Sequence, residues 1–375
     1  MFIDKINNLP DNRLEIIKRI KTSGKKLYLY GAGTRAVMLT DFLKNYDIDI
    51  YAYCVDDMYY ISGQTLYGKP VLKFSDCCAD DSVFLIAFQN YERASEIISQ
   101  NKKVAMFYID DPYDFYKMDF EYILRNEKKF SESYEMMSDE LSQNVFVSFI
   151  NGKISDSPQM LCSLRDKNGY QYDYDLLALG EDEVIVDCGA YTGDTINDIM
   201  KYTYGKCRKI IAFEPDKKNC DTLMQSAFMD NITVINKGVW DKKDVLRFHS
   251  SKSTASSFNE YADGNMTEFI SDEKNYIEVP VTSIDDEINE DVTFIKMDIE
   301  GSELKALQGA SRTIKRCYPK LAICVYHRVD DFITIPQYIN SLCSEDVKYK
   351  FYMRHHAAWM AETVLYAIPE KKRED

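Results

Sequence analysis

The chain has 375 residues, of which 45% are hydrophobic and 29% are charged, and its formal net charge is −15. This length predicts about two to three domains. The acidic excess argues against long nucleic acids and anionic membranes as partners, and ten cysteines without a C-x-x-C pair argue against a zinc site.

No targeting or spanning segment is expected. The N-terminal stretch is charged throughout and is typical of a helix rather than of a secretion signal. The longest apolar run, residues 83–88, is too short to cross a bilayer. We therefore expect a cytoplasmic protein with reduced cysteines.

The first part of the chain alternates apolar strand-like runs with helix-like stretches. Strands are expected at 27–30, 48–55, 83–88 and 104–109, with a helix at 91–100. This alternation predicts a small Rossmann-like α/β domain over residues 1–112.

A glycine pattern follows the first of these strands. Gly31 and Gly33 are followed by Ala36 in the third position, and Asp56 ends the next strand. The pattern approximates a dinucleotide-binding fingerprint. Two interpretations stay open, a tight turn without a ligand and a site for a nucleotide or nucleotide sugar; a redox cofactor is less favoured than either.

Residues 113–182 lack strand-like alternation and are rich in tyrosine, phenylalanine and charge. We expect a helical linker that bridges two domains.

A second α/β domain is predicted over residues 183–375, so the fold class is α/β with two doubly wound domains. Its parallel strands are expected at 184–187, 209–214, 232–236, 292–298 and 321–327. Two inserted strands are expected at 245–248 and 276–281, the latter at a sheet edge because it contains Pro280. Residues 349–355 and 363–368 should form an antiparallel C-terminal pair.

The first strand of this domain and the loop after it predict a ligand-binding site. An apolar strand ends at Asp187, and a loop with Gly189 and Gly193 leads into a helix. The helix directs free N–H groups at the loop, and the glycines leave room for a ligand. A carboxylate there would repel a phosphate, so the loop suits a cationic ligand such as S-adenosylmethionine (SAM). We expect Asp187 to hold its ammonium end through the loop, directly or by water. The expected cofactor-binding residues of the loop are Asp187, Gly189, Ala190, Tyr191, Thr192, Gly193 and Asp194.

Two further acids follow neighbouring strands. Glu214, before Pro215, and Asp298 should reach the same crevice, because parallel strands end at one edge of the sheet. We expect Glu214 to accept hydrogen bonds from the ribose hydroxyls and Asp298 to lie near the sulfonium and the acceptor. Pro215, Gly238 and Asp298 complete the expected cofactor-binding set. Glu303 is interpreted instead as a first-turn acid that favours the helix dipole.

The four histidines all lie in this domain. His327, His355 and His356 fall at predicted strand ends, and an imidazole there could take a proton from a hydroxyl. His355 ranks above His327 because Arg354 and His356 beside it suggest a polar rim. The expected catalytic residues are His355, His327, Asp298 and His356, and no metal is expected because no ligand-spacing motif is present.

These motifs together resemble the FkbM family of SAM-dependent methyltransferases. The resemblance rests on residues 187–195, 213–215, 296–303 and 307–310, on Tyr326-His327 and on 354–356, and it covers roughly 183–368. It implies a seven-stranded methyltransferase fold, SAM as cofactor and O-methylation, often of sugar or polyketide hydroxyls. The first domain resembles the small Rossmann-like domains of nucleotide-sugar-modifying enzymes.

Two other functions stay open. One is a nucleotide- or sugar-binding regulatory protein whose methyltransferase half only senses SAM. The other is an NAD-linked oxidoreductase that uses residues 31–36. The methyl acceptor, a small molecule or a glycan, and the oligomeric state are left open.

Overall fold

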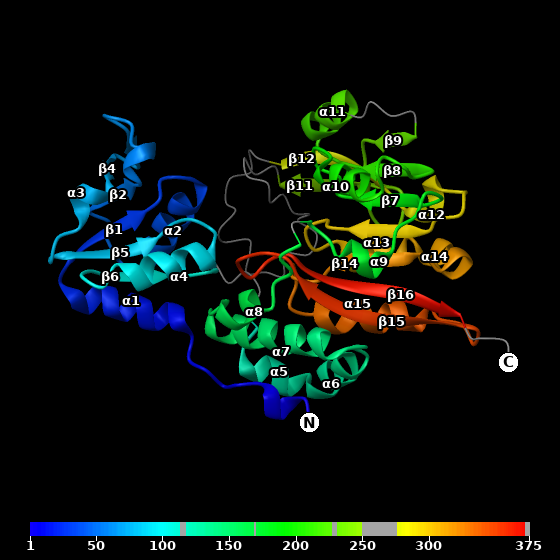
Figure 1. The fold of residues 1–375 in the computed structure, drawn as a ribbon, viewed down its shortest axis with the longest axis horizontal. Coiled ribbons are helices and arrows are strands. Elements are labelled where there is room, and N and C mark those ends of the chain that lie inside the picture. Colours follow the sequence, from blue (N-terminus) through cyan, green and yellow to red (C-terminus); the bar gives the residue numbers. More distant parts are fainter. Residues whose placement is uncertain (113–117, 169, 227–230, 250–275, 372–375) are drawn as a thin grey trace.

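The computed structural model describes residues 1–112, 118–168, 170–226, 231–249 and 276–371. It consists of an N-terminal and a C-terminal α/β unit, side by side (Figure 1). Helices from the middle of the chain pack against the C-terminal unit. Within the described residues, no helix is both long and apolar enough to span a membrane.

The N-terminal unit contains one six-stranded sheet. Its elements are η1 (Ile3–Lys5), α1 (Asn12–Ser23), β1 (Lys26–Tyr30), α2 (Thr34–Lys44), β2 (Ala52–Val55), η2 (Asp57–Tyr59), β3 (Thr65–Leu66), β4 (Lys69–Lys73), α3 (Phe74–Cys77), β5 (Ser82–Ile86), α4 (Tyr91–Gln100) and β6 (Ala105–Tyr108). The strand order is β3-β4-β2-β1-β5-β6, parallel except for the β3–β4 pair. The α/β prediction is confirmed, but β3 and β4 were not expected, because they are short and β4 contains charged residues and a proline.

The middle of the chain is helical and packs on the C-terminal unit. Its helices are α5 (Phe120–Arg125), α6 (Glu127–Glu135), α7 (Glu140–Ser155), α8 (Gln159–Ser163) and α9 (Tyr174–Leu177). The start of the chain joins this group, since the Phe2 ring lies 5.4 Å from Tyr134 and 5.8 Å from Phe146 between ring centroids. Residues 2–6 therefore pack away from the N-terminal sheet.

The C-terminal unit contains a seven-stranded sheet of order β15-β16-β14-β13-β7-β8-β9. Its strands are β7 (Val184–Cys188), β8 (Lys209–Phe213), β9 (Ile232–Ile235), β13 (Phe294–Met297), β14 (Lys320–Cys324), β15 (Val347–His355) and β16 (Thr363–Lys371). Its helices are α10 (Asp194–Tyr202), α11 (Lys217–Ser226), α12 (Ile284–Glu287), α13 (Glu303–Gln308), α14 (Ser311–Cys317) and α15 (Asp331–Ser341). Five strands are parallel and the β15–β16 hairpin is antiparallel, which confirms the predicted fold.

A small sheet of order β10-β12-β11 is inserted, from β10 (Gly238–Val239), β11 (Asp244–His249) and β12 (Tyr276–Thr282). The strand with Pro280 is therefore central, not at an edge as predicted. The proline is tolerated because β10 pairs only with Val281 and Thr282, so at Pro280 the strand pairs on one side alone, with Val245 of β11.

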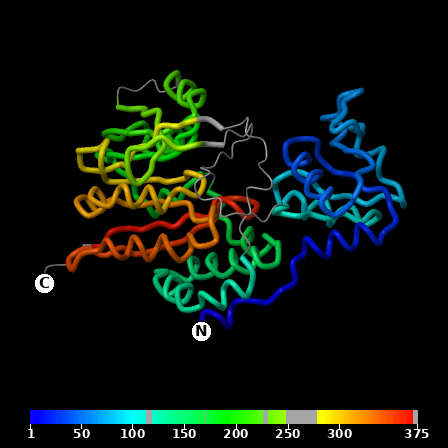
Figure 2. The backbone as a smooth tube through the Cα atoms, turned by 180° about the vertical axis from the view of Figure 1, so that it is seen from behind, coloured from blue at the N-terminus to red at the C-terminus, as the bar shows by residue number. Residues whose placement is uncertain are grey.

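The N-terminal unit contacts the connection between β15 and β16 (Figure 2). Asp110, after β6, accepts a hydrogen bond from the Met360 N–H at 3.0 Å. The Tyr91 N–H, at the start of α4, donates to the Ala358 carbonyl at 2.6 Å. The two units therefore meet beside the chain that leads into β16.

Candidate active site

The glycine loop connects β7 to α10 through left-handed backbone. Gly189, Tyr191 and Gly193 have φ values of 81°, 48° and 94°. A Cβ on Gly189 would lie 2.0 Å from the carbonyl oxygen of Asp298, and one on Gly193 would lie 2.7 Å from Leu223 Cδ1. The contact with the Asp298 backbone requires a glycine at 189, and the left-handed backbone favours one at 193, so both have a reason within the protein; room for a ligand stays a prediction.

Asp187 has a protein partner that we did not predict. Its carboxylate is fully buried and lies 3.0 Å from Lys296 Nζ, because β7 and β13 place these residues directly opposite each other. Lys296 also donates to the Gly189 carbonyl at 2.8 Å. Burial acts to lower the pKa of Lys296, but the charges of Asp187 and Asp298 outweigh it and raise that pKa above its ordinary value. Asp187 is thus linked to the loop through Lys296, and its contact with a cofactor ammonium, directly or by water, stays a prediction.

Glu214, immediately after β8, connects this strand to the glycine loop. Its carboxylate accepts hydrogen bonds from the N–H groups of Tyr191 at 2.9 Å and Asp216 at 2.8 Å. Burial raises the pKa of Glu214 to about 7, although both hydrogen bonds favour the ionised form. The carboxylate oxygens can accept more than these two bonds, so ribose binding by Glu214 stays a prediction.

The other predicted cofactor residues lie around the same loop. Ala190 is buried, Thr192 is half-buried, and Pro215 accepts a hydrogen bond from Asn236 Nδ2 at 3.1 Å. Gly238 is buried and pairs with Val281 within the small sheet, which gives it a structural role.

The sequence interpretation missed a residue that covers the start of α10. Gln171, from the linker, donates through Nε2 to Asp194 at 3.3 Å and accepts from Thr195 Oγ1 at 2.9 Å. No local pattern could identify it, because its position depends on the linker returning to the sheet.

An acidic cluster surrounds His327, three residues beyond β14. His327 Nδ1 lies 3.0 Å from Glu303, and Nε2 lies 3.5 Å from Asp298 and 3.4 Å from Glu300. Burial acts to lower the pKa of His327, but Glu303, Glu300 and Asp298 outweigh it and raise that pKa well above its ordinary value. These three acids therefore favour the protonated form of the ring.

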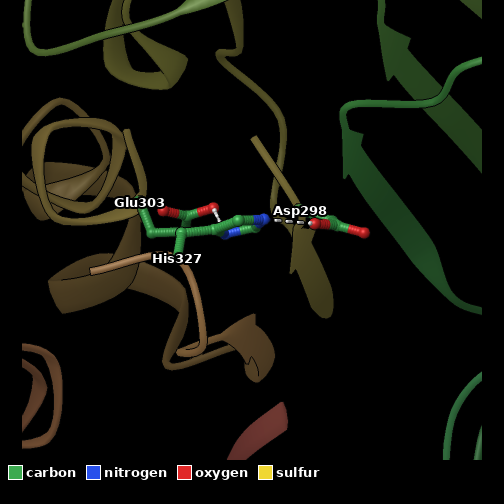
Figure 3. A group of neighbouring side chains, drawn as sticks. All are labelled: Asp298, Glu303 and His327. Atoms are coloured by element: carbon green, nitrogen blue, oxygen red, sulfur yellow. Dashed lines mark ion pairs between the residues drawn. The ribbon is translucent and has the colours of Figure 1, made fainter. Parts of the chain in front are cut away.

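The donor atoms of Asp298, Glu303 and His327 lie within 4.8 Å of one another, close enough to suggest a metal ion. Figure 3 shows the imidazole between the two carboxylates, with Nδ1 towards Glu303 and Nε2 towards Asp298. This arrangement is that of an ion-paired histidine, since its two nitrogens face different acids.

Three more residues near Asp298 were not predicted. Tyr326 donates its hydroxyl to Asp298 Oδ1 at 3.2 Å. Burial, together with the charge of Asp298, raises the pKa of Glu362 to about 7. The hydroxyl of Tyr172 is buried without a hydrogen-bond partner among the described residues, and its pKa is raised by burial and by neighbours that include Asp298.

The other two candidate bases, His355 and His356, are buried in positions that do not suit proton transfer to a ligand. His355 is fully buried, its Nδ1 lies 3.0 Å from Thr363 Oγ1, and burial lowers its pKa to about 3. His356 Nε2 lies 2.9 Å from the Tyr366 hydroxyl, and burial lowers the pKa of His356 to about 4. The predicted ranking of His355 above His327 is therefore wrong, because the last residue of β15 faces the interior instead of a polar rim.

The N-terminal glycine pattern has an explanation within the protein. A Cβ on Gly31, whose φ is 131°, would lie 2.6 Å from the Ala87 carbonyl oxygen. Asp56 accepts hydrogen bonds from Tyr30 and from Arg93, the latter at 2.6 Å. Packing thus accounts for Gly31 and Asp56 without a ligand, and a nucleotide near Gly33 stays a prediction.

Comparison with known proteins adds the following. Residues 187–362 match the family model of the methyltransferase FkbM domain. The structure is similar to that of methyltransferase FkbM from Methylobacillus flagellatus KT, with 25% identity and a TM-score of 0.72, over 97% of this chain and 95% of that one. A putative rRNA methylase from Clostridium thermocellum aligns with 54% of this chain and 94% of its own, at 10% identity and a TM-score of 0.34. No protein with a curated description matches the sequence.

Proposed function

We propose that this chain is a SAM-dependent methyltransferase that methylates a hydroxyl group of a small molecule or a glycan, because residues 187–362 match the family model of the methyltransferase FkbM domain and the fold is similar to that of a methyltransferase FkbM. The observation that carries the proposal is the position of His327. Its Nε2 lies 3.5 Å from the Asp298 carboxylate. The backbone carbonyl oxygen of Asp298 lies against Gly189 of the glycine loop, 2.0 Å from where a Cβ on Gly189 would be. A proton acceptor therefore lies beside the loop expected to hold SAM.

The site fits a cationic cofactor. Asp298, Glu300 and Glu303 surround a single imidazole, so the cluster keeps negative charge even when His327 is protonated. When bound, SAM supplies an electrophilic methyl group on a sulfonium. A cation beside Asp298 opposes the imidazolium charge and so lowers the pKa of His327, which frees Nε2 to accept a proton.

His327 then has a defined task in the reaction. Bound SAM would supply the methyl group, and transfer to the acceptor oxygen would replace the C–S bond by an O–C bond. Nε2 of His327 takes the hydroxyl proton. Glu214 holds the ribose, and Asp298 orients the acceptor beside His327.

We also propose the division into 1–112, 113–182 and 183–375, with residues 2–6 grouped with the second and third parts because they pack there. The function of the N-terminal unit would be to support the β15–β16 connection through Asp110 and Tyr91.

SAM or its demethylated product should stabilise the protein, whereas NAD and NADP should not. A ligand at a hundred times its dissociation constant adds about 2.7 kcal/mol to the free energy of unfolding. Thermal unfolding of the full chain with each ligand measures this. A folded sample whose melting temperature does not move with saturating SAM would contradict the assignment.

Glu214→Gln should weaken SAM binding roughly tenfold to a hundredfold, because a charge-assisted acceptor is lost and a new donor faces the Tyr191 N–H. Titration calorimetry measures the affinity. Glu183→Gln is the matched control, since this buried acid pairs with Lys320 before β7, away from the loop. Equal losses in both variants would place the ribose elsewhere.

The reaction class is tested by transfer of a labelled SAM methyl group to a panel of sugars, glycans and phenols. Label found in an ether linkage supports hydroxyl methylation. Label found only on nitrogen or carbon, or tight SAM binding without transfer to any acceptor in the panel, counts against it.

A further inference from the structure

Glu303 lies at the first position of α13, where the sequence suggested only a favourable interaction with the helix dipole. Its side chain is fully buried, whereas a charge that serves the dipole alone would gain by remaining in water. Its Oε1 accepts the Ile299 N–H at 2.9 Å and lies 3.0 Å from His327 Nδ1. Burial of this carboxylate therefore coincides with contact to the imidazole.

We propose that Glu303 is a positioning residue that fixes the His327 ring with Nδ1 towards the interior and Nε2 towards Asp298 and the methyl-transfer crevice. The proposal rests on the proposed function in one respect, that His327 is the base. The orientation itself is a property of the protein without any ligand.

The surroundings of the ring support one orientation. The Tyr326 ring packs against the imidazole with centroids 4.0 Å apart, and the His327 side chain is only 9% exposed. Rotation of the ring by 180° would place carbon atoms against Glu303 and lose the contact with Nδ1. Glu303 thus distinguishes between two ring positions that occupy the same space.

The tautomer follows from the chemistry of the partner. An ionised carboxylate only accepts hydrogen bonds, so the neutral ring keeps its proton on Nδ1 and exposes the lone pair of Nε2. Nε2 is the nitrogen near Asp298 and Glu300, at 3.5 and 3.4 Å. Glu303 therefore directs the basic atom at the crevice.

Other charges act on the same ring. The charged and titratable groups around His327 come from five places in the chain: Asp298 after β13, Glu300 in the following turn, Glu303 of α13, Asp331 of α15 and Glu362 before β16. Only Glu303 lies against Nδ1 among the ion pairs of the described residues, so it alone is expected to select the tautomer.

Nitrogen NMR of the full chain with isotope-labelled histidine tests the proposal without SAM or acceptor. The chain has four histidines, and His327→Gln assigns the signal of interest. Above its titration midpoint, His327 should show the Nδ1–H tautomer in the unmodified protein. In Glu303→Leu, which offers Nδ1 no acceptor, the Nδ1–H signature should be lost, and the midpoint should fall by about one pH unit or more, a tenfold change in proton affinity.

Glu183→Gln is the control and should leave the His327 signals unchanged, because its carboxylate pairs with Lys320 elsewhere. An Nε2–H tautomer in the unmodified protein would overturn the proposal, as would a tautomer and midpoint that do not change in Glu303→Leu. Loss of the His327 signature on treatment with EDTA would overturn it in favour of a metal ligand. If Glu303→Leu does not fold, the tautomer observed in the unmodified protein is the deciding result. If the unmodified protein shows the Nδ1–H tautomer but a His327 variant retains turnover, His327 is not the base. The orientation of its ring by Glu303 would still hold.

Discussion

Replacing Lys296 by methionine should lower the free energy of unfolding by about 3–5 kcal/mol, because it leaves a buried carboxylate without its cation. Asp187 is fully buried and Lys296 is 3.0 Å away with 2% of its side chain exposed, so water cannot take the place of the ammonium group. Urea denaturation of the purified variant measures the change.

Two further variants separate the ion pair from simple loss of a lysine. Lys320→Met removes the cation opposite Glu183, but the Lys320 side chain is 23% exposed, so we expect a smaller loss. The double variant Asp187→Asn/Lys296→Met should recover part of the stability lost in Lys296→Met, since no unpaired charge remains buried. A loss below about 1 kcal/mol in Lys296→Met, the range of exposed pairs, would contradict this account.

The Lys296→Met substitution should also affect the glycine loop that is expected to hold the cofactor. Lys296 Nζ donates to the Gly189 carbonyl at 2.8 Å, and it is the only described side chain that joins Asp187 to this loop by an ion pair. Weaker SAM binding in the variant would therefore accompany the lower stability.

His327→Ala should lower turnover roughly 10²- to 10⁴-fold, the usual contribution of general-base catalysis, with little change in SAM affinity. Only the neutral ring accepts a proton, so turnover of the unmodified enzyme should rise with pH as the imidazolium titrates. The variant should lose this limb of the profile. Initial rates with a methyl acceptor over a range of pH, together with calorimetric SAM affinities, measure both effects.

His355→Ala provides the comparison, because burial lowers the pKa of His355 to about 3 and its ring does not reach the crevice. We expect this variant to lose stability through a cavity while keeping the pH profile of the unmodified enzyme. If His327→Ala instead retains full turnover, Asp298 or Glu300 becomes the candidate base.

The sequence alone determined the fold class, and it predicted an approximate place for the site. Apolar runs of strand length, the glycine loop after Asp187 and acids at strand ends are local patterns, and local patterns are set by backbone preferences and by the period of two in a strand. Because parallel strands end at one edge, Glu214, Asp298 and His327 could be assigned to one crevice without coordinates.

The tertiary structure decided which charged side chains form pairs with one another. Asp187 and Lys296 are far apart in the chain, and only the register of β7 against β13 makes them partners. His327 follows β14 and His355 ends β15, so their sequence positions are similar. His327 nevertheless lies beside Asp298, whereas His355 is fully buried. Burial and charge pairing depend on which distant segments pack together, and a local pattern carries no information about that packing.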